Sequence, residues 1–378
     1  MSTTKSQYIW QKKNWTHFSW QSDRLLPLLG KARHVQGKIL ARAKSLELAL
    51  THEAQAEILT EEAVKTAAIE GEVLDIDVVR SSVARHLGLP RAGLPRIERY
   101  VDGLVEILLD ATKNYNKPLT SQRLKAWHAA LFPTGYSGLH KIRVGQWRGL
   151  EPMQVVSGAL GREKIHFQAP PNDKLGEEIK TFFIWWKKSL GHTEGFLRAA
   201  IAHFWFVTIH PFEDGNGRIT RVLTDMALAQ DENLQVRFYS LSSQIMEERN
   251  AYYGVLEKCQ KGKQDITEWL VWFLGCLIRA MEKSETIIAT VLTKAEFWQK
   301  HNQTTLNSRQ RKVVNRLLDA GKGKFEGGLT TRKYVSLTKT SRATAFREIS
   351  DLVEKGVLIQ NQKNKGRNVN YDIKWSSN

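Results

Sequence analysis

The chain has 378 residues, enough for two or three domains that each bury a core. Its 56 Lys and Arg residues outnumber its 39 Asp and Glu residues, which gives a net charge of +17. It has no uncharged apolar run of about 18 residues and no apolar signal core at its start, so neither a membrane-spanning nor a secreted protein is expected. Cys259 and Cys276 offer no disulfide framework and no metal-ligand spacing, and both are expected on apolar helix faces. We expect a cytoplasmic protein whose positive charge either meets a polyanionic partner or is unevenly distributed.

Residues 9–48 combine large apolar side chains with many basic residues. The apolar positions are Trp10, Trp15, Trp20, Leu25, Leu26 and Leu29. Tryptophans at this spacing serve as packing anchors more often than as a cage for a ligand. We therefore expect an N-terminal helical domain over residues 1–95.

The segment Thr60–Gly71 is typical of a helix with both ends marked. Thr60 is a suitable N-cap, acidic residues follow in the first turn, and Gly71 suits the position just beyond the last turn. Glu70 then lies where the helix dipole disfavours a negative charge. This position indicates either a cationic partner for Glu70 or an ordinary helix end.

Residues 148–171 lack helical periodicity and predict a β-hairpin. Met153–Val156 and Lys164–Phe167 are short strand-like runs around a glycine turn, Gly158–Gly161. An exposed hairpin edge can bind an extended peptide through its main chain. A plain surface hairpin is the alternative. The candidate contact residues are Val155, Val156, Ile165 and His166.

The segment from His210 to Arg221 has the highest density of reactive side chains. It reads His-Pro-Phe-Glu-Asp-Gly-Asn-Gly-Arg-Ile-Thr-Arg, and apolar residues at helical spacing precede and follow it. We therefore expect a helix, a tight turn and a second helix. Gly215 and Gly217 permit unusual backbone angles and leave N–H groups unobstructed, so the second helix begins at a phosphate-binding turn.

The polar side chains of this segment suit the transfer of a nucleotidyl or phosphoryl group. Asp214 is a hard oxygen ligand for Mg²⁺, and Asn216 can donate to a phosphate oxygen. Arg218 and Arg221 are three residues apart, share a helix face and can clamp a polyphosphate. His210 can take a proton from an attacking hydroxyl.

Positive charge is concentrated in residues 301–378, which hold 16 Lys and Arg against 6 Asp and Glu. Helices are expected over 307–318 and 341–354, with Ser341 as the N-cap of the second, and a short helix or strand over 329–336. Two strands, 357–359 and 369–373, flank a basic turn that holds Lys363, Lys365 and Arg367.

This order of helices and hairpin resembles the winged-helix DNA-binding domain. The resemblance implies that Arg342, Thr344 and Arg347 face the major groove and that the basic turn lies near phosphates. A protein-docking or dimerisation module is the alternative.

The segment His210–Arg221 resembles the signature of the Fic family, His-x-Phe-x-Asp/Glu-Gly-Asn-Gly-Arg-x-x-Arg, and fills every specified position. The resemblance implies transfer of AMP from Mg–ATP to a Ser, Thr or Tyr hydroxyl, with His210 as the base and Asp214 on magnesium. Gly215, Asn216, Gly217 and Arg218 are implied to surround the phosphates. Fic relatives that phosphorylate depart from the signature near its end, so the intact Arg221 favours AMP transfer.

Further segments are similar to parts of Fic proteins. Thr66-x-x-x-Glu70-Gly71 resembles the family's inhibitory motif, whose glutamate pairs with the second signature arginine, here Arg221, in the place of the ATP γ-phosphate. The hairpin resembles the flap that aligns the target as an added strand. His166 is close to this flap and could stack on the adenine, and a solvated histidine is the alternative. Either Tyr252 or Tyr253 is implied to border the adenine, and at least one of the two is expected in the core. The N-terminal helices resemble a domain of unknown function that precedes many bacterial Fic cores.

The sequence thus predicts a mainly α-helical protein in three parts. These are a helical domain (1–95) with an inhibitory helix (60–71), a Fic core with a β-hairpin flap (96–290) and a winged helix (291–378). The expected function is that of an autoinhibited protein adenylyltransferase that uses ATP and Mg²⁺ and acts on a target protein or on itself. Two alternatives stay open: removal of AMP by the same site, and a nucleotide-gated DNA-binding regulator that mainly modifies itself. DNA and a second copy of the chain are candidate partners, and no membrane is expected.

Overall fold

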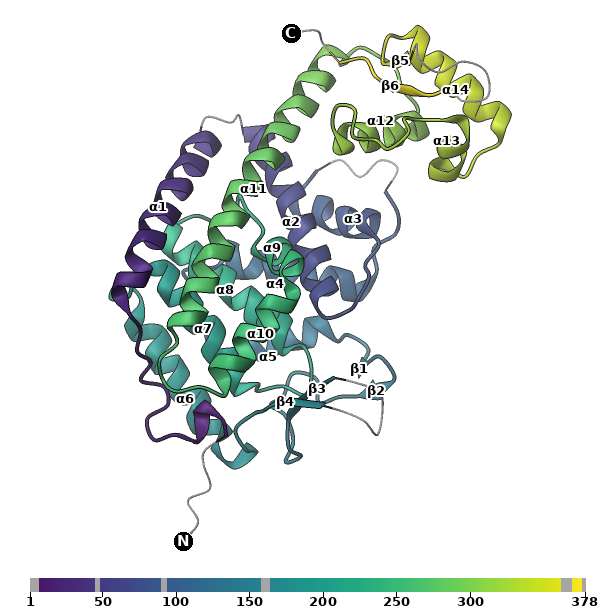
Figure 1. Ribbon diagram of the computed structural model, residues 1–378. Helices are drawn as coiled ribbons and strands as arrows, with labels where there is room; N and C mark the ends of the chain where they lie inside the picture. The colour runs from purple at the N-terminus through teal and green to yellow at the C-terminus, as the bar shows by residue number, and fades with distance from the viewer. Residues whose placement is uncertain (1–6, 45–47, 90–93, 158–163, 362–368, 376–378) are drawn as a thin grey trace. The chain divides into compact units, whose positions relative to one another are not determined.

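Helices make up most of the chain, which confirms the predicted mainly α fold (Figure 1). The computed structural model describes residues 7–44, 48–89, 94–157, 164–361 and 369–375. The chain divides into two compact units, one of Met1–Leu46, Gln55–Leu89 and Pro95–Ser284, and one of Glu47–Ala54, Pro90–Leu94 and Glu285–Asn378. Among the described helices, none combines the length and the hydropathy that crossing a bilayer requires.

The elements follow one another in this order along the chain. A short 3-10 turn, Ile9–Gln11, precedes α1 (Ser22–Lys44), α2 (Leu48–Ile69), α3 (Ile76–Leu87), α4 (Arg99–Lys113), α5 (Ser121–Leu131), α6 (Asn172–Ser189) and α7 (Gly195–Ile209). Then come α8 (Asn216–Glu232), α9 (Leu241–Glu247), α10 (Arg249–Gln260), α11 (Thr267–Lys300), α12 (Ser308–Ala320), α13 (Thr331–Thr338) and α14 (Arg342–Glu354). The strands pair as antiparallel hairpins: β1 (Tyr136–Ser137) with β2 (His140–Lys141), β3 (Gln154–Ser157) with β4 (Lys164–Gln168), and β5 (Leu358–Gln360) with β6 (Tyr371–Ile373).

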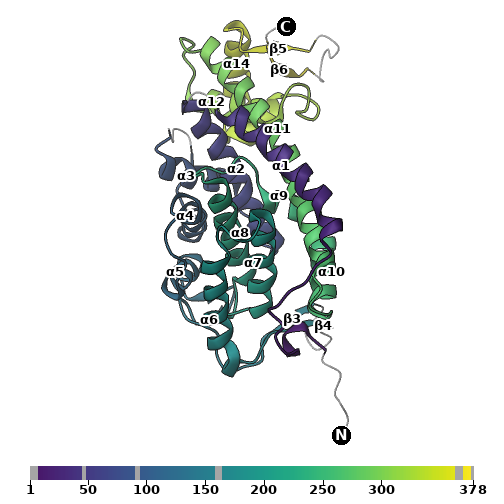
Figure 2. The same cartoon turned by 90° about the vertical axis from the view of Figure 1, so that its left-hand side faces the viewer.

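Helices α7 and α8 lie side by side in the middle of the larger unit (Figures 1 and 2). Every residue of α7 from Phe196 to Ile209 is buried. A helix that is apolar on all sides belongs in the centre of a domain, and this one is surrounded by neighbours rather than covered on a single face. Helix α4 packs on α8, and α5 packs on α4 and α8. The loop between α7 and α8, which holds the predicted site, is therefore carried by two packed helices, of which α7 is buried along almost its whole length.

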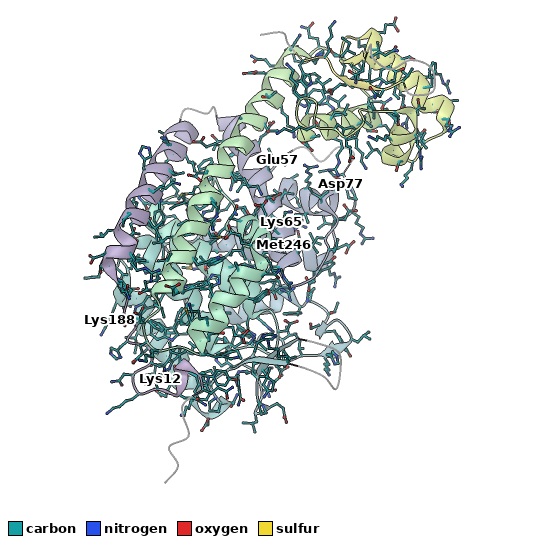
Figure 3. The ribbon with its side chains drawn as sticks, viewed as in Figure 1. Lys12, Glu57, Lys65, Asp77, Lys188 and Met246 are labelled. Carbon is teal, nitrogen blue, oxygen red and sulfur yellow. The ribbon has the colours of Figure 1, made fainter. Side chains whose placement is uncertain are left out.

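The tryptophans near the N-terminus act as packing anchors, as predicted. The Trp15 ring meets Trp205 of α7 edge-on at 6.0 Å, and Leu25 is buried. Lys12, labelled in Figure 3, donates to the carbonyl of Gly262, just after α10. Leu26, in contrast, is largely exposed. The N-terminal segment and the helices that follow it thus pack as parts of one compact unit.

The predicted start of a helix at Thr60 is wrong. Helix α2 begins twelve residues earlier, at Leu48, because the residues before Thr60 are strong helix formers that continue the apolar pattern, and Thr60 itself is buried. The predicted end is confirmed: α2 stops at Ile69, and Gly71 adopts a positive φ of 87°.

The smaller unit has the elements that the sequence predicts in residues 301–378. Helix α12 carries a buried face of Val313, Val314, Leu317 and Leu318, as expected, and Ser341 caps α14 by accepting from the Thr344 N–H at 3.1 Å. The segment predicted as a short helix or strand is helix α13. Strands β5 and β6 pair as expected, while the basic turn with Lys363, Lys365 and Arg367 lies outside the described residues, as does the glycine turn Gly158–Gly161. The winged-helix assignment stays a prediction.

Candidate active site

The loop between α7 and α8 has a backbone shape that two positions enforce. His210 ends α7 with φ at 51°, and Gly215 precedes α8 with φ at 76°. A Cβ atom on Gly215 would lie 2.8 Å from the Phe132 ring, so both the backbone angle and the available space require glycine there. The predicted helix, tight turn and helix are confirmed.

Asn216 closes this loop from inside. Its side-chain oxygen accepts from the Phe212 N–H at 2.9 Å, and its amide nitrogen donates to the Phe212 carbonyl at 2.8 Å. The Phe212 ring is buried and stacks on His128 at 4.3 Å. The sequence interpretation gave Asn216 a phosphate oxygen as its acceptor. The side chain is buried and bonded through both of its polar atoms, so it braces the loop, and a contact with phosphate through its second N–H stays a prediction.

His210 holds its ring in the orientation that a base requires. Its Nδ1 lies 3.1 Å from the Val207 carbonyl oxygen, which can only accept, so the proton is on Nδ1 and Nε2 keeps a lone pair. Burial lowers the pKa of His210, and the nearby Arg148 charge adds to that effect. The ring is therefore neutral at pH 7 and can accept a proton.

Arg148 fastens the loop from outside, and the sequence analysis missed it. Its Nε donates to the His210 carbonyl at 2.9 Å, its main-chain N–H donates to the Pro211 carbonyl at 2.9 Å, and its Nη2 donates to the Pro170 carbonyl. The side chain is buried, and burial lowers its pKa. Arg148 thus joins the base of the β3–β4 hairpin to the catalytic loop. No residue pattern marks this role, because an arginine in a loop is ordinarily solvated.

Asp214 presents one carboxylate at the edge of the site. Its Oδ1 accepts from the Gly215 N–H at 2.6 Å, and its Oδ2 accepts from the Ser137 hydroxyl of β1. The side chain is 45% exposed. Among the described residues, no group of three or more His, Cys, Asp or Glu is arranged around a common metal position. A single fixed carboxylate nevertheless fits Mg²⁺, which is commonly held by one or two carboxylates together with phosphates and water.

Arg221 is buried and bonded to the end of α2 through Nε and Nη2. Its Nε donates to Thr66 Oγ1 at 2.6 Å, and its Nη2 donates to the Thr66 carbonyl at 2.9 Å and to Glu70 Oε1 at 2.7 Å. Burial by itself would lower the pKa of Arg221, but the Glu70 carboxylate raises it above its usual value. The cationic partner predicted for Glu70 is therefore Arg221.

The Glu70 carboxylate also fills space at the start of α8. Its Oε1 lies 2.1 Å from where a Cβ atom on Gly217 would be, so it touches the bare backbone of the first turn. An anion thus lies at a helix N-terminus that suits phosphate.

Arg218 has a partner that the sequence analysis did not name. Its Nη1 lies 3.0 Å from both carboxylate oxygens of Glu72, and its Nη2 lies 3.8 Å from Asp214 Oδ2. The guanidinium stands over the Phe132 ring at 5.0 Å. Glu72 follows Glu70 by two residues. This spacing could have suggested the pair only if the path of the chain after Gly71 were known.

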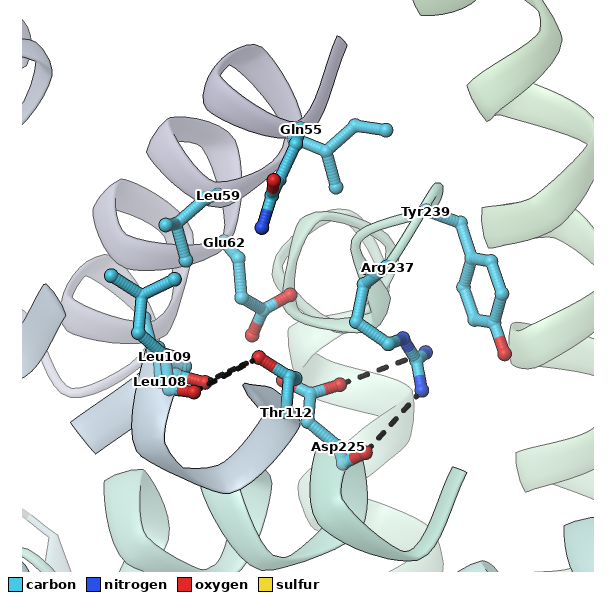
Figure 4. A pocket seen from close by; sticks show the side chains of 10 residues that line it. Gln55, Leu59, Glu62, Leu108, Leu109, Thr112, Asp225, Arg237 and Tyr239 are labelled. Carbon is cyan, nitrogen blue, oxygen red and sulfur yellow. Dashed lines mark hydrogen bonds and ion pairs between the residues drawn. The ribbon is translucent and has the colours of Figure 1, made fainter. Parts of the chain in front are cut away.

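Helix α2 is also anchored beside α8 by a buried group of charged residues (Figure 4). Glu62 of α2 accepts from the Ser240 hydroxyl at 2.7 Å, and Arg237 Nη2 lies 3.7 Å from Asp225 of α8. Burial and the neighbouring Glu62 carboxylate raise the pKa of Asp225. The cavity that they line, about 20 Å³, has room for about one water molecule. This anchor lies about two helical turns before Glu70.

The two candidate tyrosines lie in different environments. Tyr252 is a core residue whose hydroxyl pairs with His203 Nε2 at 2.9 Å, and burial raises its pKa. This confirms that one of the pair belongs to the core. Tyr253 is less buried, and its hydroxyl lies 3.5 Å from the Ile69 carbonyl, which Arg249 also contacts at 2.8 Å. Tyr253 therefore remains the candidate to border an adenine.

Strands β3 and β4 form the predicted hairpin. Val155 pairs with Phe167 and Val156 with Ile165, with an irregularity between the two valines, and Val156 and Ile165 are exposed. His166 Nδ1 lies 2.8 Å from Glu257 of α10, so its ring is tied to that helix rather than solvated.

The N-terminal segment supports this hairpin. The Tyr8 ring packs edge-on against Phe167 at 5.3 Å, and Trp10 Nε1 donates to the Gln168 carbonyl at 2.7 Å. The strand β4 is thus held on one side by residues that precede α1.

A family model described as Fic/DOC family matches residues 118–228, the stretch that contains α5 to α8 and the loop between the last two. The chain carries a Fic domain. A second model, described as a domain of unknown function (DUF4172), matches residues 8–89 of this Fic-domain protein. The Fic match lies in the larger unit, and the second match lies there too except for Glu47–Ala54, which belong to the smaller unit. The predicted domain boundaries stay predictions.

The Fic-domain protein is also similar to individual proteins. A protein of Aquifex aeolicus (strain VF5) named "Probable protein adenylyltransferase" is 31% identical over 114 residues, which are 28% of this chain and 35% of that protein. The match therefore spans about a third of the length of this curated relative.

A crystal structure of a Fic family protein from Desulfovibrio desulfuricans G20 aligns with 94% of this chain and 97% of its own, with a TM-score of 0.54 and 17% identity. A Fic domain containing signaling protein from Bacteroides thetaiotaomicron VPI-5482 aligns with 68% of this chain and 97% of its own, with a TM-score of 0.53 and 17% identity. At these identities the two structures show the shared fold.

Proposed function

We propose that this Fic-domain protein is an adenylyltransferase, which moves AMP from ATP to a hydroxyl group of a target protein or of itself. The observation that supports this most is the surroundings of His210. A neutral imidazole with Nε2 free stands on a loop whose other end is a bare helix N-terminus, flanked by the buried cations Arg218 and Arg221. A base beside a polyphosphate site is the arrangement that transfer of a nucleotidyl group needs.

In the proposed reaction, the attacking hydroxyl gives its proton to His210 Nε2, while Nδ1–H stays on the Val207 carbonyl. The hydroxyl oxygen forms a bond to the α-phosphorus, the bond between that phosphorus and the bridging oxygen breaks, and pyrophosphate leaves. The N–H groups at the start of α8 and the two arginines stabilise the charge on the phosphates. Asp214 would hold Mg²⁺, which supplies further charge neutralisation when it is bound.

We further propose that the described arrangement is the inhibited one. Arg221 is bonded to Thr66 and Glu70, and the Glu70 carboxylate occupies the start of α8 at Gly217. A triphosphate can use Arg221 only if Glu70 leaves it. The pairing therefore supports slow transfer until the end of α2 rearranges.

The β3–β4 hairpin is the proposed guide for the target. Its exposed Val156 and Ile165 offer side-chain contacts, and an extended target segment could pair with the edge of the hairpin through its main chain. Arg148 links the end of this hairpin, at Pro170, to the loop with His210.

The test is incubation of the purified chain with Mg–ATP, followed by intact-mass analysis and by measurement of released pyrophosphate. Addition of one AMP per modified hydroxyl, with an equal amount of pyrophosphate, would support the proposal. Profiling of a cell lysate with labelled ATP then identifies targets. If AMP is instead released from a previously modified protein, with no net transfer from ATP, the alternative function, removal of AMP by the same site, replaces the proposal.

For the smaller unit we propose contact with DNA through α14. Arg342 and Arg347 are exposed on this helix, in the part of the chain with the greatest excess of positive charge. Phe346 between them is 59% exposed, and it suits contact with a thymine methyl group. A salt-dependent gel shift with DNA from upstream of the protein's own gene tests this. Failure to bind DNA at low salt would favour the protein-docking alternative.

A further inference from the structure

The end of α2 faces the start of α8 with two acids, and the second acid has a partner of its own. Arg221 pairs with Glu70 at 2.7 Å, and Arg218 pairs with Glu72 at 3.0 Å. Both signature arginines of the Fic loop are therefore bonded to carboxylates from one short segment. Only the first pair belongs to the inhibitory motif recognised in the sequence.

The two pairs share an asymmetry in exposure. The arginine side chains are 5% and 2% exposed at Arg218 and Arg221, whereas the carboxylate side chains are 42% and 30% exposed at Glu72 and Glu70. A buried guanidinium that loses its only counter-charge is strongly destabilised. The arginines are therefore the fixed half of each pair. When Glu72 leaves, Arg218 keeps only the more distant Asp214, at 3.8 Å. An acid that leaves is therefore best replaced by another anion, such as a phosphate group.

The segment that carries the acids can move without α2 leaving its place. Helix α2 is anchored farther back by the buried Glu62, and its last carbonyl, that of Ile69, is held by Arg249. Beyond that point the chain turns at Gly71, and Val73 is 94% exposed. A change confined to residues 70–73 would thus remove both carboxylates from the arginines, while Arg221 keeps its bonds to Thr66.

We propose that Glu72 is a second internal competitor of the nucleotide, which holds Arg218 as Glu70 holds Arg221. The two acids then stand in for two phosphate groups of the triphosphate. This inference rests on the proposed function in one respect, namely that the loop binds ATP. Arg218 is the arginine near Asp214, with 3.8 Å between Nη2 and Oδ2, so Glu72 competes with the phosphate next to the one that is attacked. Glu70 competes with the phosphate beyond it.

Different nucleotides separate the two competitors. ADP lacks the terminal phosphate, so its binding should depend on Glu72 more than on Glu70, while ATP binding should depend on both. The variants are Glu72→Gln and Glu70→Gln in the full chain, and Glu106→Gln on α4 is the matched control. Glu106 is exposed, and its substitution changes the net charge by the same amount. Affinities for ADP and ATP are measured by calorimetry in the presence of Mg²⁺.

Glu72→Gln should raise the affinity for ADP about tenfold, equal to about 1.4 kcal/mol, because the competing charge is lost while the size of the side chain is kept. Glu106→Gln should leave it unchanged, and Glu70→Gln should affect ATP more than ADP. Unchanged ADP affinity in Glu72→Gln would overturn the proposal, and so would an effect of Glu70→Gln on ADP as large as its effect on ATP.

A second variant covers the case in which Glu72→Gln folds poorly because Arg218 has lost its partner. Glu72→Asp keeps the charge but shortens its reach, so its ADP affinity should lie between those of the wild type and Glu72→Gln. An affinity equal to the wild type in a folded Glu72→Asp protein would count against Glu72 as a competitor. Binding is measured without any transfer of AMP. A chain that binds ADP as described but never transfers AMP would therefore sink the proposed function and leave this inference standing.

Discussion

Replacement of Glu70 by glycine should raise the rate at which the resting protein transfers AMP. The change removes a carboxylate that Arg221 Nη2 contacts at 2.7 Å and clears the space beside Gly217. A hydrogen bond to a charged group contributes about 1.5–3 kcal/mol. If ATP must displace that bond to reach Arg221, transfer at a fixed ATP concentration should rise by about 10- to 10²-fold, since about 1.4 kcal/mol is a factor of ten.

The assay is self-modification with labelled ATP at one Mg–ATP concentration below saturation. It compares wild type, Glu70→Gly, Glu70→Gln and Arg221→Ala. Glu70→Gln should give a smaller gain, because it removes the charge but keeps a side chain at the start of α8. Arg221→Ala should give no gain, because it removes the inhibitory pair together with the arginine that holds the phosphate. If Glu70→Gly incorporates no more label than wild type, the autoinhibition hypothesis is wrong, and the pair with Arg221 is only a helix-end contact.

The remaining predictions concern single groups. His210→Ala should lower AMP transfer by about 10² or more while ATP binding stays nearly intact, and unchanged turnover would refute its role as the base. Burial lowers the pKa of His210, so kcat/KM should rise with pH through a midpoint below pH 6.5, as the ring loses its proton. A midpoint above that pH would contradict the burial argument. Ser137→Ala should raise the Mg²⁺ concentration needed for half-maximal nucleotide binding, because Asp214 loses the hydroxyl that orients it, whereas Ser137→Thr should not. Arg342→Glu with Arg347→Glu should abolish a DNA gel shift but spare self-modification, and a shift of unchanged strength would redirect attention to protein partners.

The sequence predicts the elements near the loop well because local rules govern them. The glycines around Asn216 and the apolar runs on either side determine a helix, a turn and a helix, whatever the rest of the chain does. The end of α2 at Gly71 follows from local chemistry in the same way. Its start does not, since Thr60 could cap a helix but lies inside a longer one whose neighbours stabilise it.

Long-range contacts account for what the sequence could not supply. Arg148 acts through carbonyl groups of His210, Pro211 and Pro170, and carbonyl groups have no signature in a sequence. Asn216 looks only like a phosphate ligand until its bonds to Phe212 are known. Glu72 stands next to a recognised motif, but its partner lies 146 residues away in the chain.

In the proposed function, the two ends of the N-terminal region have opposite roles, because Tyr8 and Trp10 support strand β4 of the hairpin while Glu70 pairs with Arg221. A protein shortened from this end to remove Glu70 would also lose the brace beneath the hairpin that is proposed to guide the target. The two proposals together therefore predict that trimming within residues 8–72 changes both the rate and the selectivity of transfer, whereas a substitution at Glu70 changes the rate and leaves the support of the hairpin in place.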